Sequence, residues 1–306
     1  MIQLTYNGVD ITGDVSINRC LHDMYGGGRA DTLSLRLNDV RNLWDTWAPS
    51  ARDEIRVDFG GANTGTMFLS SSIARNGYFE IVAQSAPKSG FLKQRKAWQQ
   101  VRLLQIGEEI AARNGLTFSS YGVTDRLYSY VLQDDVSDFA FLNWRAKLEG
   151  CVFQVYDKRL IMYSEPYMEA VEPVEALELA TDGDYEYTPR QADLYGACVV
   201  SSGQYTGEFT ADNGSALVYR PDAFGGVGNK VEAERFAKGL LRSVNKGCMS
   251  GFVRTPVMAG YAAGSTVALV NPRAPSWDGP VFLDHVRNDY ITGKSKIFFH
   301  KPLEGY

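Results

Sequence analysis

The sequence predicts an α+β fold that is mainly β, with two β modules on either side of a small α+β insert. Apolar and polar residues alternate at period two near both ends of the chain, whereas the middle has helical spacing. One hairpin plan also occurs twice, at 53–70 and 264–284. Each copy has a β-rich run, a turn containing Gly, and a second run led by Gly65-Thr66 or Gly279-Pro280. This repetition indicates that both copies serve one assembly.

The bulk properties favour a globular protein of two or three domains. A chain of 306 residues is long for a single hydrophobic core. Its 44% hydrophobic and 22% charged residues fit neither a disordered nor a membrane-spanning chain, and its apolar runs are far shorter than the roughly 20 residues of a membrane helix. The N-terminal residues read as a strand entering a turn, so we expect no secretory signal. The net charge of -5, without long runs of either sign, shows no basic nucleic-acid surface.

The cysteines indicate neither a zinc site nor a disulfide framework. The four of them are widely spaced and include no C-x-x-C pair: Cys20, Cys151, Cys198 and Cys248. We expect buried, reduced thiols.

Residues 1–88 read as the first β module. Runs at 32–38 and 55–59 alternate at period two, and 78–83 supplies another short strand. Polar alternate positions indicate strands with one wet face. The Gly26-Gly27-Gly28 run predicts a flexible loop.

Residues 89–166 read as the α+β insert. Helical spacing over 101–114 ends at Asn114-Gly115, and a second helix begins after Ser137 and ends at Gly150. Runs at 151–156 and 159–163 predict a hairpin across Asp157-Lys158.

Residues 167–306 read as a linker and the second β module. The prolines and acids of 165–178 predict an extended linker. Short strands are expected at 197–202, 207–210 and 217–219. Asn229 and Glu232 form a capping-box pattern at the start of a helix that ends at Gly247. Strands return at 252–256, 267–270, 281–286 and 296–300.

A search for chemistry assigns no catalytic, cofactor-binding or metal-binding residue. Only His22, His285 and His300 are available as histidines, and Cys20 with His22 has no second pair at metal-site spacing. We therefore favour a loop or strand role for His22 and a structural or interface role for His285. Gly225-Gly226-Val227-Gly228 lacks the further residues of a phosphate loop and reads as a helix-capping loop.

Acidic and aromatic residues give equally weak signals. Asp182, Asp184, Glu186 and Asp193 echo a calcium loop, but Tyr187 stands where that loop needs Gly, so a solvated strand edge is favoured. We expect Glu108 and Glu109 to face water on their helix. We expect Asp134 and Asp135 to lie just before the next helix. Trp44 and Trp47 are read as core anchors rather than sugar platforms.

An ordered set of short motifs extends along the chain. The first motif is 29–39, followed by Trp44, Trp47, Pro49, 53–55 and 65–68. The insert contributes Leu103, Ile106, Ile110, Ala111 and Gly115, then 137–139, 148–150 and Leu160. The last module contributes Ala233, Ala237, Leu240, Leu241, 264–267, Gly279, Val281 and Gly305-Tyr306. In their order and spacing these motifs resemble phage late control gene D proteins, the baseplate hub proteins of contractile phage tails, and related prophage tail proteins. The resemblance covers nearly the whole chain.

The resemblance implies two β-barrel-like tube domains and a non-enzymatic structural role. A homotrimer would present six similar modules and join a six-fold tail tube to a three-fold spike. Implied partners are the tail tube protein, the spike protein and other baseplate proteins, with DNA passing through the lumen without specific binding. No cofactor is implied. The implied location is the virion tail baseplate, assembled in the bacterial host cytoplasm.

Two other readings stay open on the residues alone. Aromatic and carboxylate content is compatible with a cell-wall-active hydrolase or a carbohydrate-binding module. The hub portion of a type VI secretion spike shares the implied architecture. The acids at 182–186 and the loop at 26–28 match nothing in the family pattern.

Overall fold

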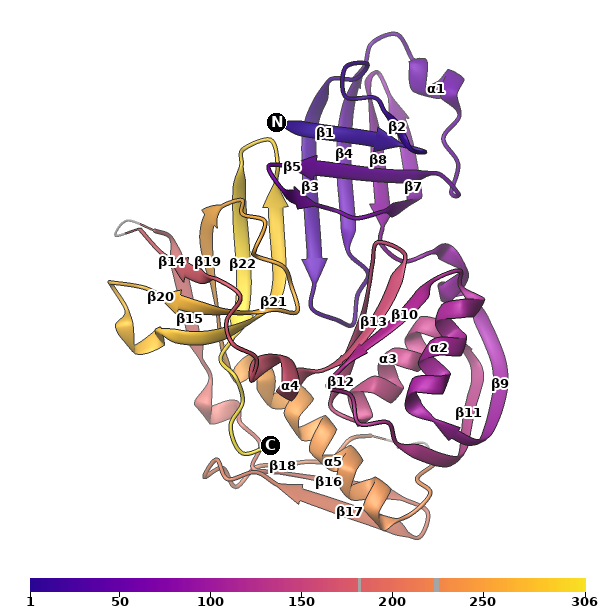
Figure 1. Cartoon of the computed structure of the whole chain (residues 1–306). Coiled ribbons are helices and arrows are strands. Elements are labelled where there is room, and N and C mark those ends of the chain that lie inside the picture. The colour runs from indigo at the N-terminus through magenta and orange to yellow at the C-terminus, as the bar shows by residue number, and fades with distance from the viewer. Residues whose placement is uncertain (181–182, 223–225) are drawn as a thin grey trace.

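The expected fold class is confirmed. The structure is a computed structural model that describes residues 1–180, 183–222 and 226–306. Strands account for 47% of the residues and helices for 20%. Figure 1 shows the N-terminal strands in indigo, the C-terminal strands in yellow beside them, and the helices packed below and to one side.

The N-terminal strands form the first module. Its main strands are β1 (Ile2–Tyr6), β3 (Ile17–Tyr25), β4 (Thr32–Asp39), β5 (Glu54–Phe59), β7 (Met67–Arg75) and β8 (Gly77–Gln84). Short elements complete it: β2 (Val9–Asp10), β6 (Ala62–Asn63) and helix α1 (Leu43–Trp47). In Figure 1, β1 and β5 cross the direction of β3, β4 and β8. Apolar side chains between these strands, including Leu35, Val57 and Phe79, form a separate core.

The second module uses strands from both sides of a long helical excursion. Its strands are β14 (Ala176–Glu178), β15 (Tyr185–Pro189), β19 (Met249–Pro256), β20 (Thr266–Val270), β21 (Gly279–Asp289) and β22 (Lys294–His300). Val253, Val286 and Ile297 belong to its own core. The 3-10 turns η2 (Gln191–Asp193), η3 (Lys246–Cys248) and η4 (Pro275–Trp277) lie between these strands.

The strands of the two modules follow one topology. Neighbours run β3-β4-β8-β7-β5-β1 in the first module and β15-β19-β22-β21-β20-β14 in the second. When the strands of each module are numbered one to six along the chain, both orders read 2-3-6-5-4-1. One pairing differs in direction, because β1 is antiparallel to β5 whereas β14 is parallel to β20. Within the described residues, both modules are open sheets rather than closed barrels.

The register of the strands repeats as well. Ile55 pairs with Met67 in the first module, and Val267 pairs with Val281 in the second. This register places Gly65-Thr66 and Gly279-Pro280 at equivalent positions, as the repeated hairpin plan predicts. The β7–β8 register shifts between Leu69 and Ser71, and the β21–β22 register shifts between Leu283 and His285. Since a bulge is a specific local feature, its repetition extends the equivalence from the hairpin to the whole module.

The middle of the chain packs helices against smaller sheets. Its elements begin with η1 (Lys88–Phe91), β9 (Lys93–Arg102), α2 (Leu103–Arg113), β10 (Thr117–Tyr121), β11 (Leu127–Ser137), α3 (Asp138–Leu148), β12 (Cys151–Tyr156) and β13 (Arg159–Ser164). They continue with α4 (Glu165–Glu169), β16 (Ala197–Ser202), β17 (Tyr205–Thr210), β18 (Val218–Tyr219) and α5 (Lys230–Asn245). One core joins them, from Ile106 and Leu142 to Cys198 and Phe236.

Most expected elements form where the pattern places them. The helix after Ser137 is capped by the Ser137 side chain, which accepts a hydrogen bond from the Ala140 N–H. At α5, the Asn229 side chain accepts from the Glu232 N–H at 2.9 Å, and Glu232 accepts from the Gly228 N–H. The predicted Asn229 cap is confirmed, but Glu232 bonds the N–H of the residue before the cap rather than that of Asn229, so the full capping box does not form.

Two expectations for the middle of the chain are wrong. Residues 165–178 are not an extended linker, because they contain α4 and β14. Pro166 is compatible with α4 since the first helical turn needs no internal N–H donor there. The β9–β11 ribbon also occupies residues for which no strands were expected. Its residues are mostly exposed and polar, so they carry little apolar alternation.

The helix α5 crosses the end of α3 at a glycine that leaves no room for a side chain. A Cβ on Gly239 would overlap the backbone oxygen of Leu148 and the backbone nitrogen of Gly150. Backbone atoms cannot rotate away as a flexible side chain can. The crossing therefore depends on glycine at this position.

We expect Gly239→Ala to destabilise the protein although alanine is the better helix former. Overpacking costs roughly 1–3 kcal/mol, whereas the gain in helix propensity is about 1 kcal/mol. Urea unfolding followed by far-UV circular dichroism measures the net change. Gly13→Ala is the matched control, because a Cβ there meets no atom within 4 Å and the residue has no positive φ. Equal stability of the two variants would contradict this account of the crossing.

Candidate functional site

The joint between the two modules is the most extensive specific contact between distant parts of the chain. Strand β21 pairs with β3, from His285 opposite Tyr25 to Asp289 opposite Leu21. Backbone hydrogen bonds extend both ends of this ladder, from Gly26 N to Asp284 O at 2.8 Å and from Tyr290 N to Cys20 O at 3.0 Å. Both modules thereby share one continuous sheet, which Figure 1 shows as purple and yellow strands side by side.

A polar cluster reinforces the joint on the face away from the cores. Asp23 of β3 is 2.7 Å from His285 Nε2 and accepts from Arg287 Nε, also at 2.7 Å. The His285 ring stacks on Tyr25 at 4.5 Å between centroids and on Phe298 at 4.9 Å. Burial alone would raise the pKa of Asp23, but the hydrogen bonds from His285 and Arg287 outweigh it and lower that pKa. The cluster therefore keeps a charged carboxylate at the joint.

The other face of the joint holds a buried histidine. His22 is fully buried, and its Nδ1 lies 3.0 Å from the hydroxyl of Tyr290. Burial lowers the pKa of His22 to about 4, so the ring is neutral at neutral pH. His22 and His285 thus lie in paired strands, as a strand role for both predicts, whereas His300 lies elsewhere.

The Gly26-Gly27-Gly28 run connects the joint to the insert. Gly26 donates its N–H to Asp284 O, and its own carbonyl accepts a hydrogen bond from the Tyr163 hydroxyl. A Cβ on Gly27 would lie 2.8 Å from Cβ of Val152, and the φ of Gly27 is +145°. The residues expected to form a flexible loop instead pack against the β12–β13 hairpin. Their small size allows this close approach.

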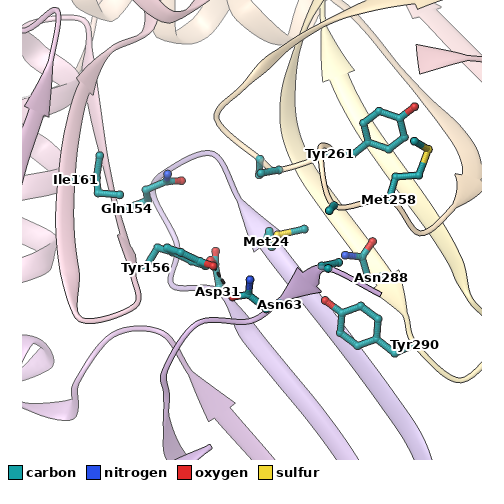
Figure 2. A pocket seen from close by; sticks show the side chains of 15 residues that line it. Met24, Asp31, Asn63, Gln154, Tyr156, Ile161, Met258, Tyr261, Asn288 and Tyr290 are labelled. Carbon is teal, nitrogen blue, oxygen red and sulfur yellow. Dashed lines mark hydrogen bonds between the residues drawn. The ribbon is translucent and has the colours of Figure 1, made fainter. Parts of the chain in front are cut away.

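A pocket of about 180 Å³ opens where the joint meets that hairpin. Figure 2 shows Tyr156 reaching from the hairpin toward Asn63 of the first module, with Tyr290 and Asn288 on the strand beyond. The Tyr156 hydroxyl donates to Asn63 Oδ1 at 2.6 Å. The turn of the hairpin is held nearby, since Asp157 accepts from the N–H of Thr66 at 3.0 Å. These contacts hold the insert against the first module.

This pocket contains one carboxylate rather than a catalytic pair. Asp31 is the only acidic residue among the described residues that line it. Burial raises the pKa of Asp31 to about 7, and the carboxylate accepts a hydrogen bond from the Tyr25 N–H at 2.8 Å. Glycosidases need two carboxyl groups across the scissile bond. The pocket therefore offers no such dyad.

A buried charge cluster ties the second module to α4 and α5. His300 has both ring nitrogens on carboxylates, with Nδ1 at 2.7 Å from Asp284 and Nε2 at 3.0 Å from Glu169. Arg242 of α5 pairs with Glu169. Lys246 and Glu165 extend the cluster, with 2.6 Å between Lys246 Nζ and the Glu165 carboxylate. Glu165 and Glu169 both belong to α4. The segment expected to be a linker thus supplies two acids that hold three parts of the chain together.

Folding favours the protonated, positively charged form of the His300 ring. Burial alone would lower the pKa of its ring, but the charges and hydrogen bonds of Asp284 and Glu169 outweigh burial and raise it to about 9. The pKa of Glu169 is lowered in turn, because hydrogen bonds and charges from His300 and Arg242 outweigh its burial.

The two modules leave two complementary free edges. The second half of β7 corresponds to the half of β21 that pairs with β3, but no described strand pairs with its outer side, and its residues 70–75 are exposed. Strand β15 corresponds to β3, and among the described strands it pairs only with β19. Among the described strands, the molecule therefore contains one closed joint and two unpaired edges at the equivalent positions of the other module ends.

The remaining residues considered for chemistry are dispersed. All four cysteines are free and buried, as expected, and burial raises the pKa of Cys20 and Cys151 to about 12. Asp182 and Gly225 lie outside the described residues, while Asp184 pairs with Arg254. Trp44 is a core residue, whereas Trp47 is 46% exposed. The described residues contain no group of three His, Cys, Asp or Glu side chains that could hold a metal ion. No described helix is long and apolar enough to span a membrane.

Other acids considered at the sequence level also have local roles. Glu109 accepts a hydrogen bond from Trp98 Nε1 at 2.9 Å and pairs with Lys96. Asp134 and Asp135 lie within β11 and pair with Arg95 and Lys93 of β9. Sequence reasoning missed the joint and the free edges, whose only local signal was the repeated hairpin.

Solved structures with the same fold include prophage tail proteins and a type VI secretion component. The 43 kDa tail protein of prophage MuSo2 from Shewanella oneidensis has a TM-score of 0.76 at 10% identity, covering 98% of each chain. A tail protein from Neisseria meningitidis MC58 has a TM-score of 0.72 at 12% identity, covering 98% of this chain and 96% of that one. An E. coli type VI secretion component has a TM-score of 0.64 at 10% identity, covering 99% of this chain and 78% of that one. No protein-family model and no curated protein matches the chain. The chain therefore has the fold of these tail proteins.

The histidine cluster predicts a specific dependence of stability on pH. Because the pKa of His300 rises from 6.5 to about 9 on folding, its stabilisation is fully present below pH 6.5 and is lost as pH rises through about 9. At about 1.4 kcal/mol per pKa unit, the loss is on the order of 3 kcal/mol. We expect His300→Gln to remove this loss in unfolding free energies measured across that range. Parallel curves for wild type and variant would contradict it.

A milder variant provides the control for that measurement. Asp284→Asn removes one negative charge beside His300 while leaving an oxygen that can accept its hydrogen bond. The side chain of Asp284 is 33% exposed, so the exchange leaves no buried void. In this variant the pH dependence of the unfolding free energy should be smaller but still present, because Glu169 still contacts Nε2 of His300.

Proposed function

We propose that the chain is a structural baseplate hub protein of a phage tail or tail-like particle. Three copies form a ring that joins the six-fold tail tube to the three-fold spike. The observation that carries this proposal is the pair of equivalent modules with one closed joint and two complementary free edges. The shared fold with prophage tail proteins supports it.

We derive the register of the proposed joint between copies from the register of the internal joint. The equivalent positions place Arg75 opposite Glu186, Ala74 opposite Tyr187 and Ile73 opposite Thr188, when β7 of one copy meets β15 of the next. Arg75 and Glu186 have opposite charges, and both are exposed in the single chain. Eight strands per chain, β15-β19-β22-β21-β3-β4-β8-β7, then continue from copy to copy. Six modules would thus surround one axis.

One position limits this edge to a specific partner. Pro189 takes the place of Met24 in the equivalent register and has no N–H to donate. Its carbonyl can still accept a hydrogen bond. A proline at the rim of an edge strand also discourages indiscriminate strand addition. The chain can therefore carry a free edge without a general tendency to aggregate.

The sheet face opposite the cores suits a lumen through which DNA passes without specific binding. Two of its arginines are paired across strands, Arg36 with Glu80 at 2.8 Å and Arg287 with Asp23 at 2.7 Å, while Lys296 lies over the rings of Phe252 and Phe298. Basic groups already bonded to acids have less to offer phosphate groups than free ones. We propose that this face lines the lumen. The tail tube protein, the spike protein and other baseplate proteins are the proposed partners, and the virion baseplate is the proposed location.

The domain arrangement follows from the three cores. We propose 1–88 as the first tube domain and 89–166 as the insert, and we propose that β16–β18 and α5 pack with the insert although they fall within 167–306. The reason is that Cys198, Phe236 and Leu240 share a core with Ile106 and Leu142. The second tube domain then consists of β14, β15 and β19–β22. No described feature favours a hydrolase.

Mass measurement in solution tests the ring. We expect a concentration-dependent trimer of the 33.9 kDa chain by light scattering. Ala74→Pro should shift the equilibrium to monomer, because Ala74 corresponds to Asn288, which pairs with His22 across the internal joint. Ala74 is exposed, so the variant subunit should keep its far-UV spectrum. Pro at an edge is tolerated within the subunit but removes a donor from the new ladder. A trimer unaffected by this change would refute the edge pairing.

A charge exchange tests the register. Arg75→Glu and Glu186→Arg should each weaken the trimer, because each places like charges opposite one another at three joints. Cross-strand pairs contribute roughly 0.2–1 kcal/mol each. The double variant should restore association. If it instead weakens the trimer as much as the two single variants combined, Arg75 and Glu186 are not neighbours and the proposed register is wrong.

A further inference from the structure

A second pocket, of about 190 Å³, lies where α5 crosses the start of β12, and its charged lining is mainly basic. Four segments contribute to it: the loop after β10, the turn before β12, the start of α4 and one face of α5. Four lining residues are cationic and one is acidic: Arg126, Arg235, Lys238, Arg242 and Glu149. On α5 the cations are spaced i, i+3 and i+7, which places them on one face of the helix. The pocket therefore concentrates positive charge.

The single acid is fully used within the protein. Glu149 accepts two hydrogen bonds from Arg235, at 3.0 and 3.1 Å, and one from the Tyr128 hydroxyl at 2.7 Å. Such a bidentate pair neutralises both partners. Arg235 and Glu149 together thus add no net charge to the pocket.

Two of the cations have no acidic partner. No carboxylate among the described residues lies within 4.0 Å of the charged groups of Arg126 or Lys238. The Lys238 ammonium lies 5.2 Å from the centroid of the Phe209 ring, a contact that leaves its charge in place. Both residues are exposed, so they can approach a ligand without rearranging a core. The lining of the pocket thus carries two cations without an ion-pair partner in the described chain.

A buried hydrogen-bond donor is also unsatisfied at this pocket. The Arg242 side chain is 3% exposed, and its Nη2 is bonded to Glu169. Its Nε is shielded from solvent and has no hydrogen-bond partner in the described structure, since the nearest oxygen of Glu165 is 3.8 Å away. Buried donors without an acceptor are rare because they lose their hydration. The charge of Arg242 is engaged by Glu169 and Glu165 inside the buried cluster, so Arg126 and Lys238 are the cations left for a ligand.

The size of the pocket restricts what can bind. Cofactors and drug-sized ligands occupy about 300–1,000 Å³, which is more than this pocket offers. Gly150 and Gly239 contribute no side chains to the wall, so backbone borders the space directly. The lining fits a small charged group that accepts several hydrogen bonds.

We propose that this pocket binds a single oxyanion group, either a phosphate or a carboxylate. Arg126 and Lys238 supply the unpaired positive charge, beside the Arg235–Glu149 pair. Because the pocket joins the insert to α5, an occupied site would stabilise the packing between them. This inference does not depend on the ring, since the pocket is formed within one chain.

Calorimetric titration of the full-length chain with sodium phosphate tests the proposal. We expect saturable binding, together with a rise in Tm that exceeds the effect of sodium chloride at equal ionic strength. Sodium acetate is titrated in parallel. Binding of phosphate alone assigns a tetrahedral oxyanion, and binding of both assigns any oxyanion group, including a carboxylate from a partner. No response beyond that to sodium chloride would overturn the proposal.

Variants locate the site. The double variant Arg126→Met with Lys238→Met should weaken phosphate binding by at least roughly tenfold, since each removes a charge-assisted contact. Lys230→Met is the matched control, because Lys230 lies on the same helix but pairs with Glu234 at 3.7 Å and is not part of the pocket. Binding that is unchanged in the double variant, or equally weakened in the control, would show that phosphate binds elsewhere.

Discussion

The fold depends on one strand that pairs differently along its two halves. Residues 279–282 of β21 pair with β20 inside the second module, whereas residues 285–289 pair with β3 of the first. The register shift at Asp284 separates the two halves. A bulge bends and twists a strand, which allows it to leave one sheet direction and join another. Asp284 also accepts the Gly26 N–H through its carbonyl and contacts His300 through its carboxylate, so the bend is fixed from both sides.

The two modules share a topology, but their edges have become different. Strand β3 has nine residues and meets a partner, whereas its counterpart β15 has five and ends in proline. The counterpart of His285 is Ser71, and the counterpart of Asp23 is Thr188, so the ionic cluster and the ring stack of the internal joint are absent at the free edges. Partly buried ionic groups cost desolvation unless they are paired. An edge that must remain soluble before assembly is better served by the small and exposed residues found on β7.

The sequence allowed the hairpin plan to be predicted because its signals are local. Gly65 and Gly279 both have positive φ, at +61° and +114°, so glycine marks the same turn position in each module. The common strand order could not be predicted, because pairings such as Asp23 with His285 span 262 residues and leave no periodic signal. Prolines made 165–178 resemble a linker, although Ser164 caps α4 and Pro166 fits its first turn. The sequence analysis identified no basic face on α5, and its approach to Arg126 emerges only from the fold.

In the proposed ring, the difference between the two kinds of joint determines the order of assembly. The internal joint combines a five-pair ladder with the Asp23 cluster and the His22–Tyr290 contact, so it forms with the subunit core. The joint between copies would contain a shorter ladder, one ion pair and no buried polar group. Forming one such joint would therefore cost little desolvation and contribute little free energy of association. Closing the ring would add the free energies of three joints. In the proposed ring, such a subunit would fold alone and would associate reversibly until the third copy completed the sheet.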